Sequence, residues 1–207
     1  MRDLNDPKKT QLYGPNIEGN VTTAKWSNNG YYIAFGDDKS GFKIIGWSPA
    51  ENDWIVKYEN PNLINGVINE ISWSEDNKKL VVVGTGGTRG VAIQLENGNK
   101  AGEINGHTAD LLTCDVAPNK PQRALVTGQD MEIQMYKGTP LKLEKSIPKA
   151  HTGFINRIGF TRPDAAHFVT VSGDKNLQVF DTATGESLFT QESKHAQGVN
   201  DFCFTSE

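Results

Sequence analysis

Several features that would place this chain in a specialised class are missing. It has no run of about 18 or more apolar residues, which a membrane-spanning helix needs, and its N-terminal stretch has no apolar core of a secretory signal. Lys and Arg form no basic cluster and the formal net charge is −4, so nucleic acid is not an expected partner. We therefore expect a cytoplasmic protein with no membrane or nucleic-acid partner.

Cysteine and catalytic motifs are equally scarce. Cys114 and Cys203 are too few for a disulfide framework, and because both lie in strand-like runs we expect reduced, buried thiols. The patterns Gly-x-Ser-x-Gly, His-Glu-x-x-His and Cys-x-x-Cys are absent. The Gly-rich stretch 84–90 lacks the Gly-Lys-Ser/Thr ending of a phosphate-binding loop, so we interpret it as a hairpin. None of these observations points to an enzyme.

What the sequence does contain is a repeat. Five strand-like runs recur at intervals of 47, 43, 44 and 44 residues, measured between their last large residues. The runs are Val21–Trp26, Ile68–Trp73, Leu111–Val116, Phe154–Phe160 and Val199–Phe204. A period of roughly 40–45 residues with four short strands per unit is typical of a β-propeller.

Each repeat continues in the same order. A turn rich in Asn, Asp, Lys or Pro leads to a second β-rich run, a turn with Gly or Asp leads to a third, and a fourth run closes the unit. This is hairpin chemistry, and no helical period is present. We therefore expect an all-β propeller arc of about four four-stranded antiparallel blades. Their approximate bounds are 21–58, 67–104, 110–147 and 154–191.

One further strand is expected at each end. Thr10–Tyr13 has the pattern of the last strand of a preceding blade, and Val199–Phe204 that of the first strand of a following blade. The chain, 1–207, is therefore expected to be a single domain that forms an incomplete ring. An open arc leaves sheet edges and apolar blade faces uncovered, so we expect self-association through the open edges.

Three of the four histidines follow the period of the fold. His107, His151 and His195 are 44 residues apart and precede the first strand of a repeat. A catalytic or metal-binding histidine has no reason to follow this period, whereas a structural one does. Asp130 and Asp174 each lie 23 residues after a histidine. We therefore expect buried imidazole–carboxylate hydrogen bonds.

Two hydroxyl side chains complete this predicted structural set. Thr127 and Ser172 lie shortly before the two aspartates, and we expect them to extend the His–Asp networks because buried polar groups need partners. All three periodic histidines receive the same structural interpretation. Neither a metal nor a cofactor is expected.

The repeats resemble the WD-repeat family. Gly106-His107 matches the family's Gly-His pair, and Phe180-Asp181 is a degraded form of its Trp-Asp pair. The stretches 31–47, 68–86, 102–116 and 135–147 are similar to the N-terminal propeller of the actin-interacting protein 1 group. That group promotes cofilin-driven disassembly of actin filaments. The resemblance implies actin filaments and cofilin as partners, a cytoskeletal location, and an arc of a seven-bladed ring.

The resemblance also implies contact residues. The group's partner surface includes an acidic residue matching Asp130, a basic one matching Lys142 and an aromatic one matching Phe154. A charged position in the second blade has Arg89 as its only counterpart. Two of these interpretations compete with structural ones, because Asp130 is also the expected partner of His107. Phe154 could equally begin its strand and pack inward.

Three functions are therefore compared. The resemblance favours a non-enzymatic WD-repeat scaffold that binds actin and cofilin and promotes filament disassembly. The alternative is a generic WD-repeat scaffold with a different protein partner. A propeller enzyme, such as a hydrolase, would need a His or carboxylate constellation along the channel, and the periodic placement of His and Asp does not favour one.

Overall fold

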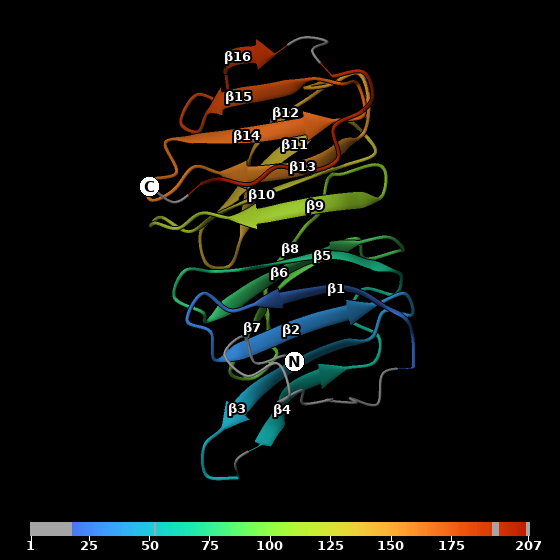
Figure 1. Ribbon diagram of the computed structural model, residues 1–207, viewed down its shortest axis with the longest axis vertical. Coiled ribbons are helices and arrows are strands. Elements are labelled where there is room, and N and C mark those ends of the chain that lie inside the picture. The colour runs from blue at the N-terminus through green and yellow to red at the C-terminus, as the bar shows by residue number, and fades with distance from the viewer. Residues whose placement is uncertain (1–17, 52, 192–194, 206–207) are drawn as a thin grey trace.

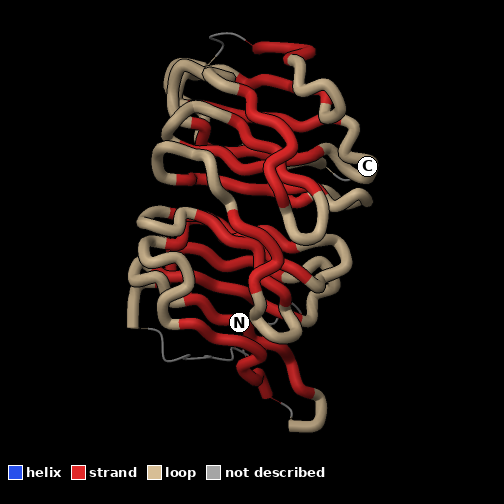
Figure 2. Tube along the Cα trace, turned by 180° about the vertical axis from the view of Figure 1, so that it is seen from behind, coloured by secondary structure: helices blue, strands red, loops and turns tan. Residues whose placement is uncertain are grey.

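Four sheets of similar size make up the molecule. A computed structural model describes residues 18–51, 53–191 and 195–205. These residues form 16 strands in four antiparallel four-stranded sheets, which we call blades 1 to 4 in chain order (Figures 1 and 2). Within each blade the strands pair in chain order, so every blade is a meander. Within the described ranges no helix is present that could cross a membrane.

The strands are four to eight residues long. Blade 1 contains β1 (Val21–Trp26), β2 (Tyr32–Asp37), β3 (Phe42–Ser48) and β4 (Asp53–Asn60). Blade 2 contains β5 (Ile68–Trp73), β6 (Lys79–Gly84), β7 (Gly90–Gln94) and β8 (Lys100–Glu103). Blade 3 contains β9 (Leu111–Val116), β10 (Arg123–Gly128), β11 (Ile133–Lys137) and β12 (Lys142–Ile147). Blade 4 contains β13 (Ile155–Phe160), β14 (His167–Ser172), β15 (Leu177–Asp181) and β16 (Ser187–Gln191).

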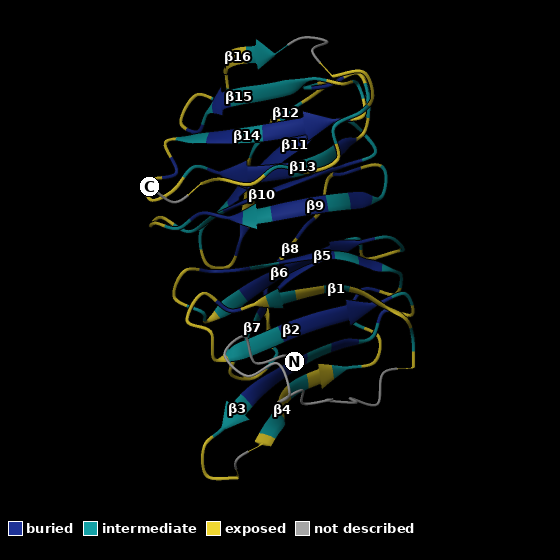
Figure 3. Cartoon of the chain, in the orientation of Figure 1, coloured by how far each residue is buried: buried dark blue, intermediate teal, exposed yellow. Residues whose placement is uncertain are grey.

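The core lies between the blades. Three clusters of buried apolar side chains join blades 1 and 2, blades 2 and 3, and blades 3 and 4. Between blades 1 and 2, for example, the ring of Tyr32 stacks on Trp73 with centroids 6.2 Å apart. Burial is therefore deepest in the middle of the arc, whereas β1, β4 and β16 carry exposed residues (Figure 3). Each blade depends on its neighbour to cover its apolar face.

The first strands of successive blades lie side by side. In blades 1 and 2 the side chain of the second residue of the first strand donates a hydrogen bond to the first carbonyl of the next blade's first strand. Asn69 Nδ2 donates to Leu111 O at 2.7 Å, and Thr22 Oγ1 donates to Ile68 O. In β9 the equivalent residue is Leu112, which has no donor, so this bond joins only some of the neighbouring first strands.

The segment predicted as a fifth first strand, Val199–Phe204, is not a strand. It lies beside β13, where Val199 O accepts a hydrogen bond from Asn156 Nδ2 at 2.9 Å, like the bonds made by Thr22 and Asn69 in blades 1 and 2. No second strand follows it in the described residues, so it has no ladder to join. Cys203 in this segment is exposed rather than buried, whereas Cys114 is buried. The other predicted end strand, Thr10–Tyr13, lies outside the described residues, and the incomplete ring stays a prediction.

Candidate interaction face

One backbone hydrogen bond recurs in every blade. The turn between the second and third strands donates an N–H to the carbonyl of the residue just before the first strand. The four bonds are Asp38 to Asn20 (3.1 Å), Thr85 to Val67 (2.9 Å), Gln129 to Asp110 (3.0 Å) and Gly173 to Phe154 (2.9 Å). These loops therefore share one face of the arc, which we call the loop face.

Two histidine–aspartate pairs lie beneath the loop face. His107 Nδ1 is 2.8 Å from Asp130 Oδ2, and His151 Nδ1 is 2.9 Å from Asp174 Oδ2. All four side chains are buried. Each carboxylate also accepts the N–H of the residue after the histidine at 3.0 Å. Each pair thus holds the loop before the first strand against the turn between the second and third strands.

The charge of Asp174 is stabilised by this arrangement. Burial by itself would raise the pKa of Asp174, but hydrogen bonds from the N–H groups of Thr152 and Asn176 and from His151 lower it below its ordinary value. The bond from Asn176 spans the turn at 2.9 Å. Asp174 therefore shapes the turn as well as orienting the imidazole.

Thr127 and Ser172 do not extend these networks, so that prediction was wrong. Thr127 Oγ1 donates to Glu132 O at 2.6 Å, and Ser172 Oγ accepts the N–H of Asp174 at 3.1 Å. The histidine contact is made by Thr170, whose Oγ1 is 2.8 Å from His151 Nε2. Thr170 and Ser172 are two residues apart and share one face of β14. The two hydroxyls nevertheless have different partners, because Ser172 ends the strand and bonds the N–H of Asp174 in the turn, whereas Thr170 lies opposite the imidazole.

His195 was predicted to be structural like the other two, but it is exposed. Among the described residues, no carboxylate pairs with His195 as Asp130 pairs with His107 and Asp174 pairs with His151. Without that carboxylate, burying the imidazole would leave a ring nitrogen unpaired at a cost.

The loop face separates the predicted contact residues by accessibility. Phe154 lies one residue before β13 and is 51% exposed, so it does not pack inward. Asp130, by contrast, is nearly covered and accepts hydrogen bonds from His107 and from the N–H of Thr108. Phe154 is thus free to meet a partner, whereas the carboxylate of Asp130 is occupied within blade 3.

Lys142 lies far from Phe154. It begins β12 and pairs with Lys137, at the end of β11 remote from the loop face, whereas Ile147 ends β12 beside Ile133 near that face. Lys142 is five residue steps of about 3.3 Å from Ile147, so it lies roughly 17 Å along the strand from the end of β12 that is near the loop face. The structure therefore does not gather Lys142 and Phe154 in one small site.

Arg89 links blades 2 and 3. Its Nη1 donates to His107 O at 3.3 Å, and its Nε is 4.0 Å from Asp110 Oδ1. The side chain borders a cavity of about 160 Å³ that Gly87, Thr88 and the chain from Glu103 to His107 also line. The Arg89 side chain as a whole is about one-third exposed, although its Nε atom is buried. Its position joins two loops of the loop face and leaves part of the charge accessible.

The central strands contain an ion cluster that the sequence interpretation missed. Glu70 of β5 is buried. Both of its carboxylate oxygens accept a hydrogen bond from Nη1 of Arg157 in β13, each at 2.6 Å. Lys25 Nζ of β1 is 3.0 Å away, and Thr113 Oγ1 of β9 donates at 2.9 Å. Burial by itself would lower the pKa of Arg157, but the neighbouring carboxylate of Glu70 raises it above its ordinary value. The cluster joins all four blades.

A signal for this cluster was present in the repeat. Glu70, Thr113, Arg157 and Asp201 each stand three residues before the last large residue of their aligned run. Arg157 Nε is also 3.3 Å from Asp201 Oδ1. Because residues in one slot of adjacent first strands face the same side, opposite charges in that slot indicate ion pairs between blades.

A second carboxylate, that of Asp115, is largely covered and makes bonds that link three blades. Asp115 of β9 accepts the N–H of Phe160 at 2.8 Å and the hydroxyl of Ser72 at 3.2 Å, and it pairs with Arg162 at 3.2 Å. Burial raises the pKa of Asp115, while Arg162 and the hydrogen bonds oppose that rise. These groups line a cavity of about 190 Å³ whose polar atoms are engaged in bonds between blades.

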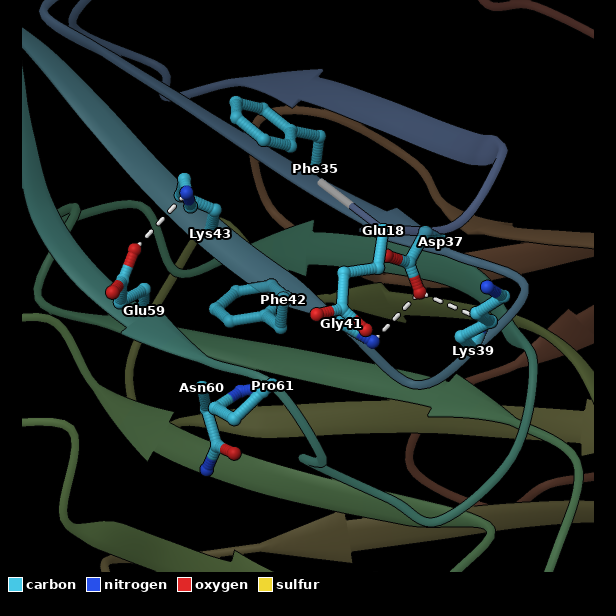
Figure 4. A pocket seen from close by; sticks show the side chains of 10 residues that line it. All are labelled: Glu18, Phe35, Asp37, Lys39, Gly41, Phe42, Lys43, Glu59, Asn60 and Pro61. Carbon is cyan, nitrogen blue, oxygen red and sulfur yellow. Dashed lines mark hydrogen bonds and ion pairs between the residues drawn. The ribbon is translucent and has the colours of Figure 1, made fainter. Parts of the chain in front are cut away.

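A further cavity of about 180 Å³ lies in blade 1 (Figure 4). Asp37 Oδ1 accepts the N–H groups of Lys39 at 2.8 Å and Gly41 at 2.7 Å, which closes the turn between β2 and β3. Lys43 pairs with Glu59 at 3.0 Å on the neighbouring wall. The polar groups here stabilise the hairpin. Nowhere in the described ranges are three or more His, Cys, Asp or Glu side chains grouped to hold a metal ion.

Comparison with known proteins shows which family has this architecture. No family model matches the chain. The rat protein "WD repeat-containing protein 1" is 32% identical over 189 residues, which is 91% of this chain. Together with the four repeated blades, this likeness decides the family. The chain is a WD-repeat protein. Its degraded Trp-Asp pairs are compatible with the fold because blade packing uses aromatic and aliphatic residues in those slots.

Other relatives of this WD-repeat chain carry different names. "Actin-interacting protein 1-2" of Arabidopsis thaliana is 35% identical over 188 residues, 90% of the chain. The "66 kDa stress protein" of Physarum polycephalum is 32% identical over 203 residues, 96% of the chain. The chain spans only 30 to 33% of the length of these relatives. What the relatives do as whole proteins therefore enters only as a proposal for this chain.

Proposed function

We propose that this WD-repeat chain is a non-enzymatic scaffold that binds cofilin-decorated actin filaments through its loop face and promotes their disassembly. The observation that carries the proposal is Phe154, a large aromatic side chain that is 51% exposed on the loop face. Exposed aromatic residues are typical anchors of protein interfaces. The actin-interacting relative supports the choice of partner, and with that partner we propose a cytoplasmic location at the cytoskeleton.

The mechanism uses binding energy alone. A scaffold that binds the cofilin-decorated filament more tightly than the bare one shifts the filament toward the decorated, less stable state. The size of the shift is limited by the ratio of the two affinities. The buried His–Asp pairs serve this function indirectly, because they hold the loops that carry the contact residues.

Filament co-sedimentation tests the proposal. The chain is pelleted with bare actin and with cofilin-decorated actin, and Phe154→Ala is compared with Leu143→Ala. Leu143 is a matched control because it is 48% exposed on the outermost strand of blade 3, away from the loop face. We expect enrichment on decorated filaments, reduced about tenfold or more by Phe154→Ala and unchanged by Leu143→Ala. Failure of the folded chain to pellet with either filament would refute the proposal.

The alternative is a WD-repeat scaffold for another protein. It is favoured by the occupied carboxylate of Asp130 and by the distance of Lys142 from Phe154, since two of the residues implied by resemblance do not join Phe154 in one site. This alternative predicts that Phe154 matters for binding to a partner other than actin. Self-association through the ends of the arc stays a prediction, which sedimentation velocity of the chain alone tests.

A further inference from the structure

The turn that contacts Phe154 differs from its three counterparts. The residue that donates the recurring backbone N–H is Asp38 in blade 1, Thr85 in blade 2 and Gln129 in blade 3, but Gly173 in blade 4. The acceptor residue differs as well, because only blade 4 has an aromatic there. Blade 4 therefore combines the exposed aromatic with a neighbour that has no side chain.

Side chains in this donor position reach the residue before the first strand. In blade 1 the carboxylate of Asp38 accepts both the backbone N–H and the side-chain amide of Asn20, each at 2.8 Å. In blade 2 the hydroxyl of Thr85 accepts the N–H of Val67 at 2.9 Å. In blades 1 and 2 the side chain at the donor position thus bonds its acceptor residue, whereas the glycine of blade 4 has no side chain to do so.

Neither backbone strain nor crowding requires the glycine. Gly173 is not among the glycines with positive φ, so any residue can adopt its conformation. A Cβ atom added to it would meet only Phe154 O, at an ordinary contact distance of 3.8 Å. Gly153 is different, because a Cβ there would lie 2.8 Å from the backbone nitrogen of Asp174. The fold needs Gly153 but can accommodate a side chain at position 173.

We propose that Gly173 is a specificity-determining residue of the loop face. Because it has no side chain, a large apolar side chain on the surface of a protein partner can reach the ring of Phe154 and pack against it. The inference rests on the proposed function and names a feature of the same site. Blades 1 to 3 do not offer this contact, since their acceptor residues are not aromatic. In blades 1 and 2 the side chain in the donor position also bonds the acceptor residue.

The test exchanges Gly173 for residues that the chain already uses in this position. Gly173→Thr and Gly173→Gln introduce the residues of blades 2 and 3, and binding to cofilin-decorated filaments is measured by co-sedimentation. We expect Gly173→Gln to weaken binding about tenfold, a change typical of one interface contact, and Gly173→Thr to weaken it less. Ala183→Gln is the control, because Ala183 is an exposed residue in the turn between β15 and β16 of the same blade, at the end of the strands opposite the loop face. It should bind as the wild type does.

A double variant separates this role from a structural one. If Gly173 acts by keeping Phe154 accessible, Phe154→Ala combined with Gly173→Gln should bind no more weakly than Phe154→Ala alone, because both changes remove the same contact. Thermal unfolding midpoints of the single variants should match the wild type.

The outcomes distinguish the inference from the function on which it rests. Wild-type binding to decorated filaments that the two folded Gly173 variants retain in full would overturn the inference and leave the function standing. Additive losses in the double variant would also overturn it. A folded wild type that does not bind the filaments would overturn both.

Discussion

Blades 3 and 4 repeat the same backbone 44 residues apart, yet they satisfy their buried histidines differently. The imidazole of His151 is bonded on both sides, by Asp174 at Nδ1 and by Thr170 at Nε2. His107 is bonded by Asp130 at Nδ1, but its buried Nε2 has no partner among the described residues. The residue 44 positions before Thr170 is Val126, which has no hydroxyl group.

The same two blades differ at the centre of the arc and on the loop face. Arg157 in blade 4 takes the slot of Thr113 in blade 3, and both contact Glu70. Phe154 likewise takes the slot of Asp110. The two blades thus share the backbone and its hydrogen bonds, whereas charge, aromatic surface and the pairing of buried polar atoms are specific to each blade. Three sets of measurements test this contrast between the blades.

The largest expected effect is on stability, when the two side chains that bond Glu70 from equivalent repeat positions are changed in turn. Arg157→Met removes the guanidinium that contacts both oxygens of Glu70 and leaves a buried carboxylate with Lys25 as its remaining cation. Breaking a buried pair is strongly destabilising, and partial exposure of Arg157 moderates the effect. We expect a loss of about 2–3 kcal/mol in the free energy of unfolding, measured by urea denaturation.

Thr113→Val is the matched change in blade 3. It removes one hydrogen bond to the same carboxylate at nearly constant volume, so a loss of about 1 kcal/mol is expected. Equal losses for the two variants would show that the charge of Arg157 adds nothing beyond a hydrogen bond. The contrast between the blades at this slot would then disappear.

A reciprocal exchange at Thr170 and Val126 tests the histidine contrast. Thr170→Val should cost about 1–2 kcal/mol, because His151 Nε2 would become a buried nitrogen without a partner. Val126→Thr should cost less, or stabilise by up to about 1 kcal/mol, because the new hydroxyl can bond His107 Nε2. Urea midpoints of both variants measure this. Similar losses in both blades would contradict the contrast.

The smallest expected effect is on the pH dependence of stability. The pKa of Asp174 is lowered in the folded state, so the unfolded chain binds a proton more readily at this group. Its contribution to stability is complete above the unfolded pKa of about 3.9 and is lost as the pH falls below that value toward the folded pKa. Between about pH 5 and pH 3 the stability of the wild type should therefore fall more steeply than that of Asp174→Asn. Parallel curves would show that Asp174 does not contribute.

Much of the architecture followed from the sequence because a periodic pattern carries local information. Turn residues and alternating apolar residues predicted the blade strands, and the 23-residue spacing brought His107 and His151 to Asp130 and Asp174. Thr170 was missed because Thr170 and Ser172 share one face of β14, and which of the two lies opposite the imidazole depends on how the loop before the first strand packs on the blade. The strand predicted at Val199–Phe204 failed because a strand needs a partner as well as a pattern.

By itself the sequence determined the period, the order of the strands and the loops that meet on one face, since these depend on neighbours along the chain. Which side chains meet across blades depends on how the blades are assembled, and the repeat indicates it only where opposite charges occupy equivalent positions. Glu70 and Arg157 are 87 residues apart and meet only because the first strands converge. Trp26, Trp73, Val116 and Phe160 fill one slot of the repeat, yet Trp26 is 51% exposed and the others 5, 2 and 0%. Each of the three buried residues is covered by the preceding blade, so packing between blades decides which of these equivalent residues belongs to the core.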